Sequence, residues 1–167
     1  RNWSLTLDVT GGEIGLSSST HRTAIASGSC LYVYTDAVHY KAGQIMNGQV
    51  HCILKEGKLR WQRQLNIARC DRGAPQLFEV ASGLLVLTQR YAFQSAARAG
   101  SESIFDVLLL SRRNGKAKKE WPVFPRAQNY NVKNYAHLEK DNNGVFRLMM
   151  SCYDGGRHEW SKKIGRF

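Results

Sequence analysis

Short apolar segments separated by glycine-containing turns dominate this chain and constrain its fold more than any other feature. The segments are rich in β-branched and aromatic residues and cover residues 3–9, 31–35, 49–54, 76–80, 84–88, 104–110, 121–124 and 145–150. Gly-Gly, Asn-Gly, Ser-Gly and Asp-Gly pairs stand between them, as is typical of turns between strands. The best helical candidate, residues 91–99, has no sustained apolar stripe and is expected to be a loop. We therefore predict an all-β fold of antiparallel strands.

Length and composition fit a single all-β domain over residues 1–167. Of the 167 residues, 43% are apolar and 10% aromatic, enough to form a core and too many for a disordered chain. No apolar run approaches the roughly 18 residues that a membrane-spanning helix needs. The first residues also lack the apolar region of a signal peptide. We expect no membrane span.

Four tryptophans indicate an internal repeat. Trp3, Trp61, Trp121 and Trp160 each begin a similar short strand, and three of them follow an apolar strand and a glycine turn. A repeat of roughly 40 to 60 residues has the size of a β-propeller blade. It divides the chain into blade-like units at about residues 4–65, 66–125 and 126–167. The alternative fold is a two-sheet β-sandwich in which the tryptophans align by coincidence.

The last hairpin carries a family resemblance. Residues 151–160 read Ser-Cys-Tyr-Asp-Gly-Gly-Arg-His-Glu-Trp, which resembles the Asp-box (BNR repeat) hairpin of sialidase-like β-propellers, Ser-x-Asp-x-Gly-x-x-Trp. It has one extra residue before the Asp and one before the Trp. Residues 111–115, Ser-Arg-Arg-Asn-Gly, followed by Trp121, are similar with Asn in place of Asp. The resemblance covers roughly residues 74–164.

The resemblance implies structural roles for the hairpin residues. Ser151, Asp154, Gly155 and Trp160 are expected to form and support a turn, in which the Asp accepts backbone N–H bonds and the Gly adopts positive φ. In the family this turn lies on the face opposite the ligand. About three blades would not close a ring, so the resemblance implies a partial propeller, completed by another subunit or belonging to a longer chain.

The same resemblance places the ligand at loops 36–48, 66–74, 89–103 and 126–131. Arginine binds carboxylate and phosphate groups bidentately, and tyrosine rings lie flat on sugars. Histidine, arginine and tyrosine side chains of these loops are therefore the expected ligand contacts: His39, Tyr40, Arg69, Arg72, Arg90, Tyr91, Arg126 and Tyr130. The expected partner is an anionic polymer or a glycan.

The charge balance agrees with an anionic partner. Lys and Arg number 24 against 13 Asp and Glu, a formal net charge of +11, and the excess is concentrated after Trp61. A basic surface of this size attracts polyanions over long distances. We predict a non-catalytic binding module and assign no catalytic residue. The alternatives are part of a sialidase-like glycoside hydrolase and a basic subunit of a nucleic-acid-containing assembly.

The cysteines favour no metal site. Cys30, Cys52, Cys70 and Cys152 lack the spacing of zinc ligands, so we expect no metal and no cofactor. They form either disulfides or buried thiols, and their pairing is left open. An extracellular setting is favoured over an intracellular one.

Overall fold

A computed structural model describes residue 4 and residues 22–28, 30–39, 44–65, 75–89, 105–123, 133–153 and 157–167. This described part contains eleven strands and no helix. Every paired strand is antiparallel to its neighbour. The predicted all-β fold is therefore confirmed.

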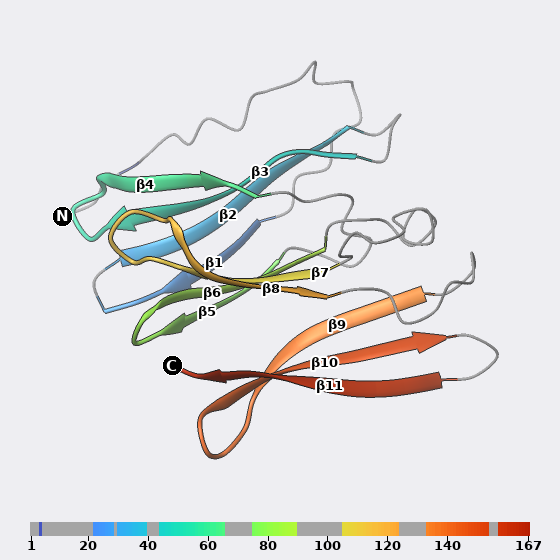
Figure 1. The fold of residues 1–167 in the computed structure, drawn as a ribbon. Helices are drawn as coiled ribbons and strands as arrows, with labels where there is room; N and C mark the ends of the chain where they lie inside the picture. Colours follow the sequence, from blue (N-terminus) through green and yellow to red (C-terminus); the bar gives the residue numbers. More distant parts are fainter. Residues whose placement is uncertain are drawn as a thin grey trace.

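The strands form three sheets, each continuous in sequence (Figure 1). Sheet A contains β1 (Arg22–Ala26), β2 (Cys30–His39), β3 (Gln44–Leu54) and β4 (Leu59–Gln64). Sheet B contains β5 (Gln76–Val80), β6 (Gly83–Gln89), β7 (Phe105–Leu110) and β8 (Ala117–Val123). Sheet C contains β9 (Lys133–Lys140), β10 (Val145–Tyr153) and β11 (Arg157–Arg166). In each sheet, strands adjacent in sequence are also adjacent in space.

The sheets stack face to face with sheet B in the middle (Figure 1). One apolar cluster joins sheets A and B and includes Tyr32, Val50 and Leu110. A second cluster joins sheets B and C and includes Leu109 and Leu148. Sheet B is therefore covered on both faces.

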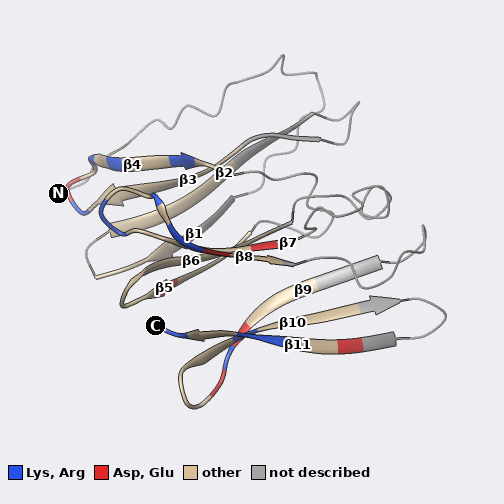
Figure 2. Ribbon diagram, viewed as in Figure 1, with Lys and Arg blue, Asp and Glu red and all other residues tan. Residues whose placement is uncertain are grey.

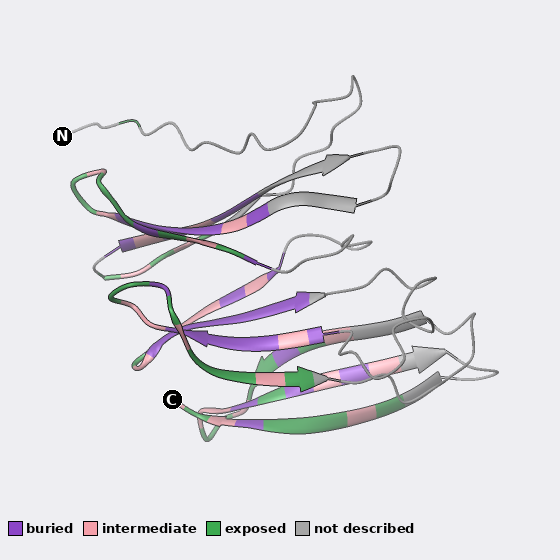
Figure 3. Ribbon diagram, turned by 45° about the horizontal axis from the view of Figure 1, so that its top comes forward, coloured by how far each residue is buried: buried purple, intermediate pink, exposed green. Residues whose placement is uncertain are grey.

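Double coverage explains the unbroken apolar runs of sheet B. Along β6, Leu84 and Val86 pack toward sheet A, whereas Leu85 and Leu87 pack toward sheet C. Successive side chains of a strand point to opposite faces, so a strand buried on both faces needs apolar residues at every position. The buried residues of β6 and β7 accordingly form the centre of the stack in Figure 3.

In sheet C, buried apolar and exposed polar side chains alternate along the strands. Phe146, Leu148 and Met150 of β10 face sheet B, while Arg147 between them is exposed. On β9, Leu138 is buried and His137 is exposed. The side of sheet C that points away from sheet B therefore carries exposed polar residues such as Arg147 and His137, and much of β11 is also exposed (Figure 3).

Consecutive strands meet in short turns at one end of the stack, which we call the turn end. It holds the β3–β4 turn (55–58), the β5–β6 turn (81–82), the β7–β8 turn (111–116), the β9–β10 turn (141–144) and the C-terminal Phe167 (Figure 1). Strands β10 and β11 instead join at the opposite end, where Tyr153 pairs with Arg157. The two hairpins that resemble the Asp-box thus have their turns at opposite ends of the stack.

The apolar segments predicted most of the strands. Residues 76–80 coincide with β5, and residues 84–88, 104–110 and 145–150 correspond to β6, β7 and β10. Strand β8 begins four residues before the expected Trp121, because its first half, with exposed Lys118, Lys119 and Glu120, is polar. Strands β1 and β9 were missed because they lack apolar runs. Residues 91–99 lie outside the described residues.

Candidate anion-binding surface

Most of the residues expected to bind a ligand lie outside the described part of the chain. They are Tyr40, Arg69, Arg72, Arg90, Tyr91, Arg126 and Tyr130. His39 is the last residue of β2, and its side chain is not described. The candidate site that the structure does describe is therefore built from other residues.

Basic residues are concentrated at the turn end of sheets A and B, where the ribbon is blue in Figure 2. Residues 55–60 and 111–118 contain seven basic residues and one acidic residue, Glu56. We call the basic set the turn-end patch: Lys55, Lys58, Arg60, Arg112, Arg113, Lys116 and Lys118. All of them are exposed except Arg112, whose side chain is 39% exposed. The result is an accessible, strongly positive surface.

The β3–β4 turn holds its charges on a tight hairpin. The Leu54 N–H donates to the Lys58 carbonyl at 2.8 Å, and the Gly57 N–H donates to the Leu54 carbonyl at 2.9 Å. Gly57 has φ 83°, a conformation that costs other residues energy. Lys55 and Lys58 are therefore presented from a fixed backbone.

The β7–β8 turn is more extensively bonded. Its ends are joined by the Ser111 N–H and the Lys116 carbonyl at 2.8 Å, and the Gly115 N–H donates to the Ser111 carbonyl at 2.9 Å. Asn114 Oδ1 accepts the Lys116 N–H at 3.2 Å. This is a local bond of the kind that Asn side chains form within turns, and Gly115 has a positive φ of 67°.

The tryptophan that packs on this turn comes from the neighbouring sheet. Trp61 of β4 is buried, and its Nε1–H donates to the Arg112 carbonyl at 2.9 Å. A Cβ on Gly115 would lie 2.6 Å from the Trp61 ring, so only glycine fits beneath it. Arg63 Nη1 also donates to the Gly115 carbonyl at 3.3 Å. Trp61, rather than the hairpin's own Trp121, supports the turn.

Arg112 is held by the edge of sheet B. Its Nη2 lies 3.0 Å from Glu79 Oε1 and donates to the Val80 carbonyl at 2.9 Å. The pairing partly neutralises Arg112, so the other six basic residues supply most of the positive field. Lys118 Nζ likewise donates to the Ser82 carbonyl at 2.7 Å, which links β8 to the β5–β6 turn.

Beneath the patch, the interface between sheets A and B is apolar and uncharged. The Tyr32 and Trp61 rings lie 5.9 Å apart, and Arg112 is near enough to Tyr32 to act electrostatically on its hydroxyl. Burial raises the pKa of Cys52 to about 12 and the pKa of Tyr32 well above its usual value, and the neighbouring Cys30 thiol adds to both shifts. Cys30 and Cys52 are buried as thiols rather than as a disulfide.

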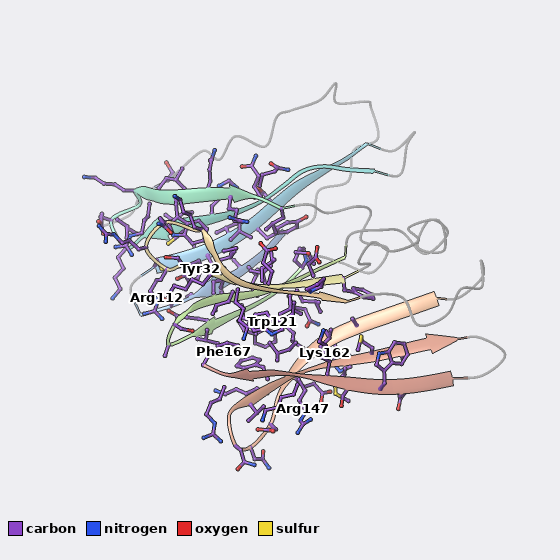
Figure 4. All side chains as sticks on the ribbon, in the orientation of Figure 1. Tyr32, Arg112, Trp121, Arg147, Lys162 and Phe167 are labelled. Atoms are coloured by element: carbon purple, nitrogen blue, oxygen red, sulfur yellow. The ribbon has the colours of Figure 1, made fainter. Side chains whose placement is uncertain are left out.

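The other described tryptophans take different positions. Trp121 of β8 packs toward sheet C, where its ring and that of Phe167 are 5.8 Å apart (Figure 4). Trp160 of β11 packs against the cluster between sheets B and C, so it faces back toward sheet B. Ser151 pairs with Glu159 across β10 and β11. Asp154 and Gly155 lie outside the described residues.

A third hydrogen-bonded turn, at β9–β10, was missed from the sequence. Asp141 Oδ1 accepts the N–H groups of Asn143 and Val145, both at 2.9 Å, and Gly144 has φ 75°. The sequence signal was the Asp-Asn-Asn-Gly run at residues 141–144. The signal for the turn-end patch was the basic residues flanking Gly57 and Gly115.

Two kinds of site are not found in the described part of the molecule. No three His, Cys, Asp or Glu side chains there could hold a metal ion together. No helix there is long and apolar enough to cross a membrane.

Comparison with protein-family models, with curated proteins and with solved structures gives no match to this chain.

Proposed function

We propose that this chain is a non-catalytic module that binds an anionic polymer or an anionic glycan. The observation that carries the proposal is the turn-end patch, where seven basic residues and one acidic residue occupy residues 55–60 and 111–118. Polyanions bind to such surfaces chiefly through release of their counterions. Rigid turns favour binding because little backbone freedom is lost.

The sheet arrangement supports a blade-like scaffold for this function. Two four-stranded antiparallel sheets, A and B, stack face to face, and Trp61 of the last strand of sheet A packs on the neighbouring sheet. Trp121 of the last strand of sheet B likewise packs on sheet C. Small sheets that bury their faces only against neighbours are typical of propeller blades. Trp160 of sheet C packs toward the preceding sheet B rather than toward a following sheet. The likeness to propeller blades therefore rests on sheets A and B.

Retention on immobilised polyanions over a salt series tests the proposal. We expect the chain to bind both heparin and nucleic acid at low salt and to elute from both as the salt concentration rises, because screening removes the attraction. Failure of every polyanion to retain the chain at low salt would contradict the proposal. So would salt-tolerant retention by a neutral glycan, because charge would then not carry binding.

A further inference from the structure

We infer that the turn-end patch is one continuous binding surface, spanning sheets A and B, for a linear sulfated polysaccharide. The inference rests on the proposed function and deepens it, because it names the surface and the partner. It also places the ligand at the turn end, whereas the sialidase-like resemblance places it at the loops 36–48, 66–74, 89–103 and 126–131.

The two halves of the patch are locked side by side. Lys55, Lys58 and Arg60 belong to sheet A, and the other patch residues belong to sheet B. Stacked sheets lie about 10 Å apart, so a polymer that contacts one turn can reach the other. The Trp61 and Arg63 bonds to the carbonyls of Arg112 and Gly115, at 2.9 and 3.3 Å, fix the β7–β8 turn against β4.

Among the described residues, the patch presents charge without an exposed aromatic side chain on which a base could stack. The ring of Trp61, which packs on the β7–β8 turn, and the ring of its neighbour Tyr32 are 7% and 0% exposed. Proteins that bind single-stranded nucleic acid combine basic grooves with aromatic side chains on which the bases stack. A sulfated polysaccharide carries its charges along the sugar chain and needs only the cationic contacts that the patch offers.

Six of the seven basic residues of the patch are exposed to solvent. Among the patch residues, Arg112 and Lys118 donate hydrogen bonds to backbone carbonyls of the β5–β6 region. Lys58, Arg60, Arg113 and Lys116 are exposed on both sides of the interface between the sheets. Two of these four residues come from each sheet, so substituting them tests whether the binding surface is continuous across sheets A and B.

The experiment compares two paired substitutions and their combination. The sheet A variant is Lys58→Gln with Arg60→Gln, and the sheet B variant is Arg113→Gln with Lys116→Gln. The matched control is Lys163→Gln with Arg166→Gln, an equal loss of charge from exposed positions of β11 outside the patch. Circular dichroism and thermal unfolding would establish that each variant is folded.

On heparin, we expect each patch variant to weaken binding about tenfold and the combination to lower the slope of log K against log salt by about 3, at roughly 0.7 per lost contact. The control is expected to lose much less. Single-stranded RNA and duplex DNA of equal charge are expected to compete less well than heparin.

The outcomes separate the two proposals. If the unmodified chain binds no polyanion, the proposed function fails. If it binds heparin but the patch variants behave like the control, the surface is wrong while the function stands. If substitution of Arg69, Arg72, Arg90 and Arg126 weakens binding while the patch variants do not, the ligand binds at the loops rather than at the turn-end patch. Preferential binding of RNA or DNA would overturn the partner.

Discussion

The indole N–H of Trp61 in sheet A donates a 2.9 Å hydrogen bond to the Arg112 carbonyl in the β7–β8 turn of sheet B. Fifty-one residues separate the two in sequence. The bond joins the two sheets where their basic turns meet, and it satisfies an indole N–H in a residue that is 7% exposed. Stability of this interface is therefore expected to depend on both the ring and its N–H.

Trp61→Phe should keep most of the packing but lose that hydrogen bond. We expect the free energy of unfolding to fall by about 1–2 kcal/mol, because the Arg112 carbonyl, in a part-buried bond, loses its donor and a smaller ring fills the site. Urea unfolding measures the change. Trp121→Phe is the comparison, since Trp121 is only partly buried. An equal loss in both variants would show that the Arg112 bond contributes nothing.

Gly115→Ala should be costly for two reasons. The residue has φ 67°, which costs Ala about 1–2 kcal/mol, and its new Cβ would lie 2.6 Å from the Trp61 ring. We expect a total loss of about 2–4 kcal/mol in unfolding free energy once overpacking is included. Gly144→Ala is the matched control.

Gly144 has a similar φ of 75°, but its Cβ would meet only Lys140 Cε, at 3.8 Å. Gly144→Ala should lower the free energy of unfolding only by the conformational cost of about 1–2 kcal/mol. Thermal unfolding of the two variants side by side separates backbone strain from the steric conflict with Trp61. Equal midpoints would mean that Trp61 moves away without cost.

Shortening a buried side chain on either face of sheet B should destabilise the protein. Leu84 and Leu85 are both 0% exposed and face sheets A and C respectively. We expect Leu84→Ala and Leu85→Ala each to lower the unfolding free energy by about 2–5 kcal/mol. Lys163→Ala on sheet C should change it by less than about 0.5 kcal/mol, because that residue is exposed. A small effect at either leucine would contradict burial of both faces.

Buried His51 should make the protein less stable in mild acid. Its Nε2 lies 2.9 Å from Thr35 Oγ1, and burial lowers its pKa below the usual 6.5. The folded state therefore resists protonation that the unfolded state accepts below pH 6.5. Stability is complete above that pH and falls as pH drops toward the folded pKa, by at most about 1.4 kcal/mol per pH unit.

His51→Gln should flatten this dependence between about pH 6.5 and 5, since Gln does not titrate there. Urea unfolding at several pH values gives the slope. Exposed His137→Gln serves as the control and should retain the slope of the unmodified protein. An unchanged slope in His51→Gln would assign the acid sensitivity to other groups.

Cys52 should resist alkylation while the protein is folded. Its pKa of about 12 leaves almost no thiolate near pH 8, and the side chain is 0% exposed. Iodoacetamide labelling followed by peptide mass mapping should show slow modification of Cys52 in buffer and fast modification in denaturant. Equal rates in the two conditions would contradict its burial.

The central strands of sheet B, β6 and β7, were predictable from sequence because both of their faces are buried. A continuous apolar run bounded by turns marks a strand without any need for alternation, and residues 84–88 and 104–110 overlap β6 and β7. Strand β9 contains Asn134, His137 and Glu139, so its apolar positions do not stand out. The start of β8 was hidden for the same reason.

The candidate surface was harder to predict. Each basic cluster is visible beside its glycine, but only the stacking of sheets A and B brings the two together. The contact of Trp61 with Gly115 depends on the same stacking, which no local pattern specifies. Sequence reasoning instead assigned the supporting role to the tryptophan that follows each turn, because neighbours in sequence are the nearest partners that a pattern can suggest.

The central position of sheet B also has a consequence for biosynthesis. Sheet A leaves the ribosome first and can cover one face of sheet B as soon as β5 to β8 appear. The other face, with Leu85, Val107 and Leu109, stays uncovered until residues 133–166 of sheet C have been made. During that interval the nascent chain exposes an apolar sheet, the kind of surface that chaperones bind and that associates with other chains.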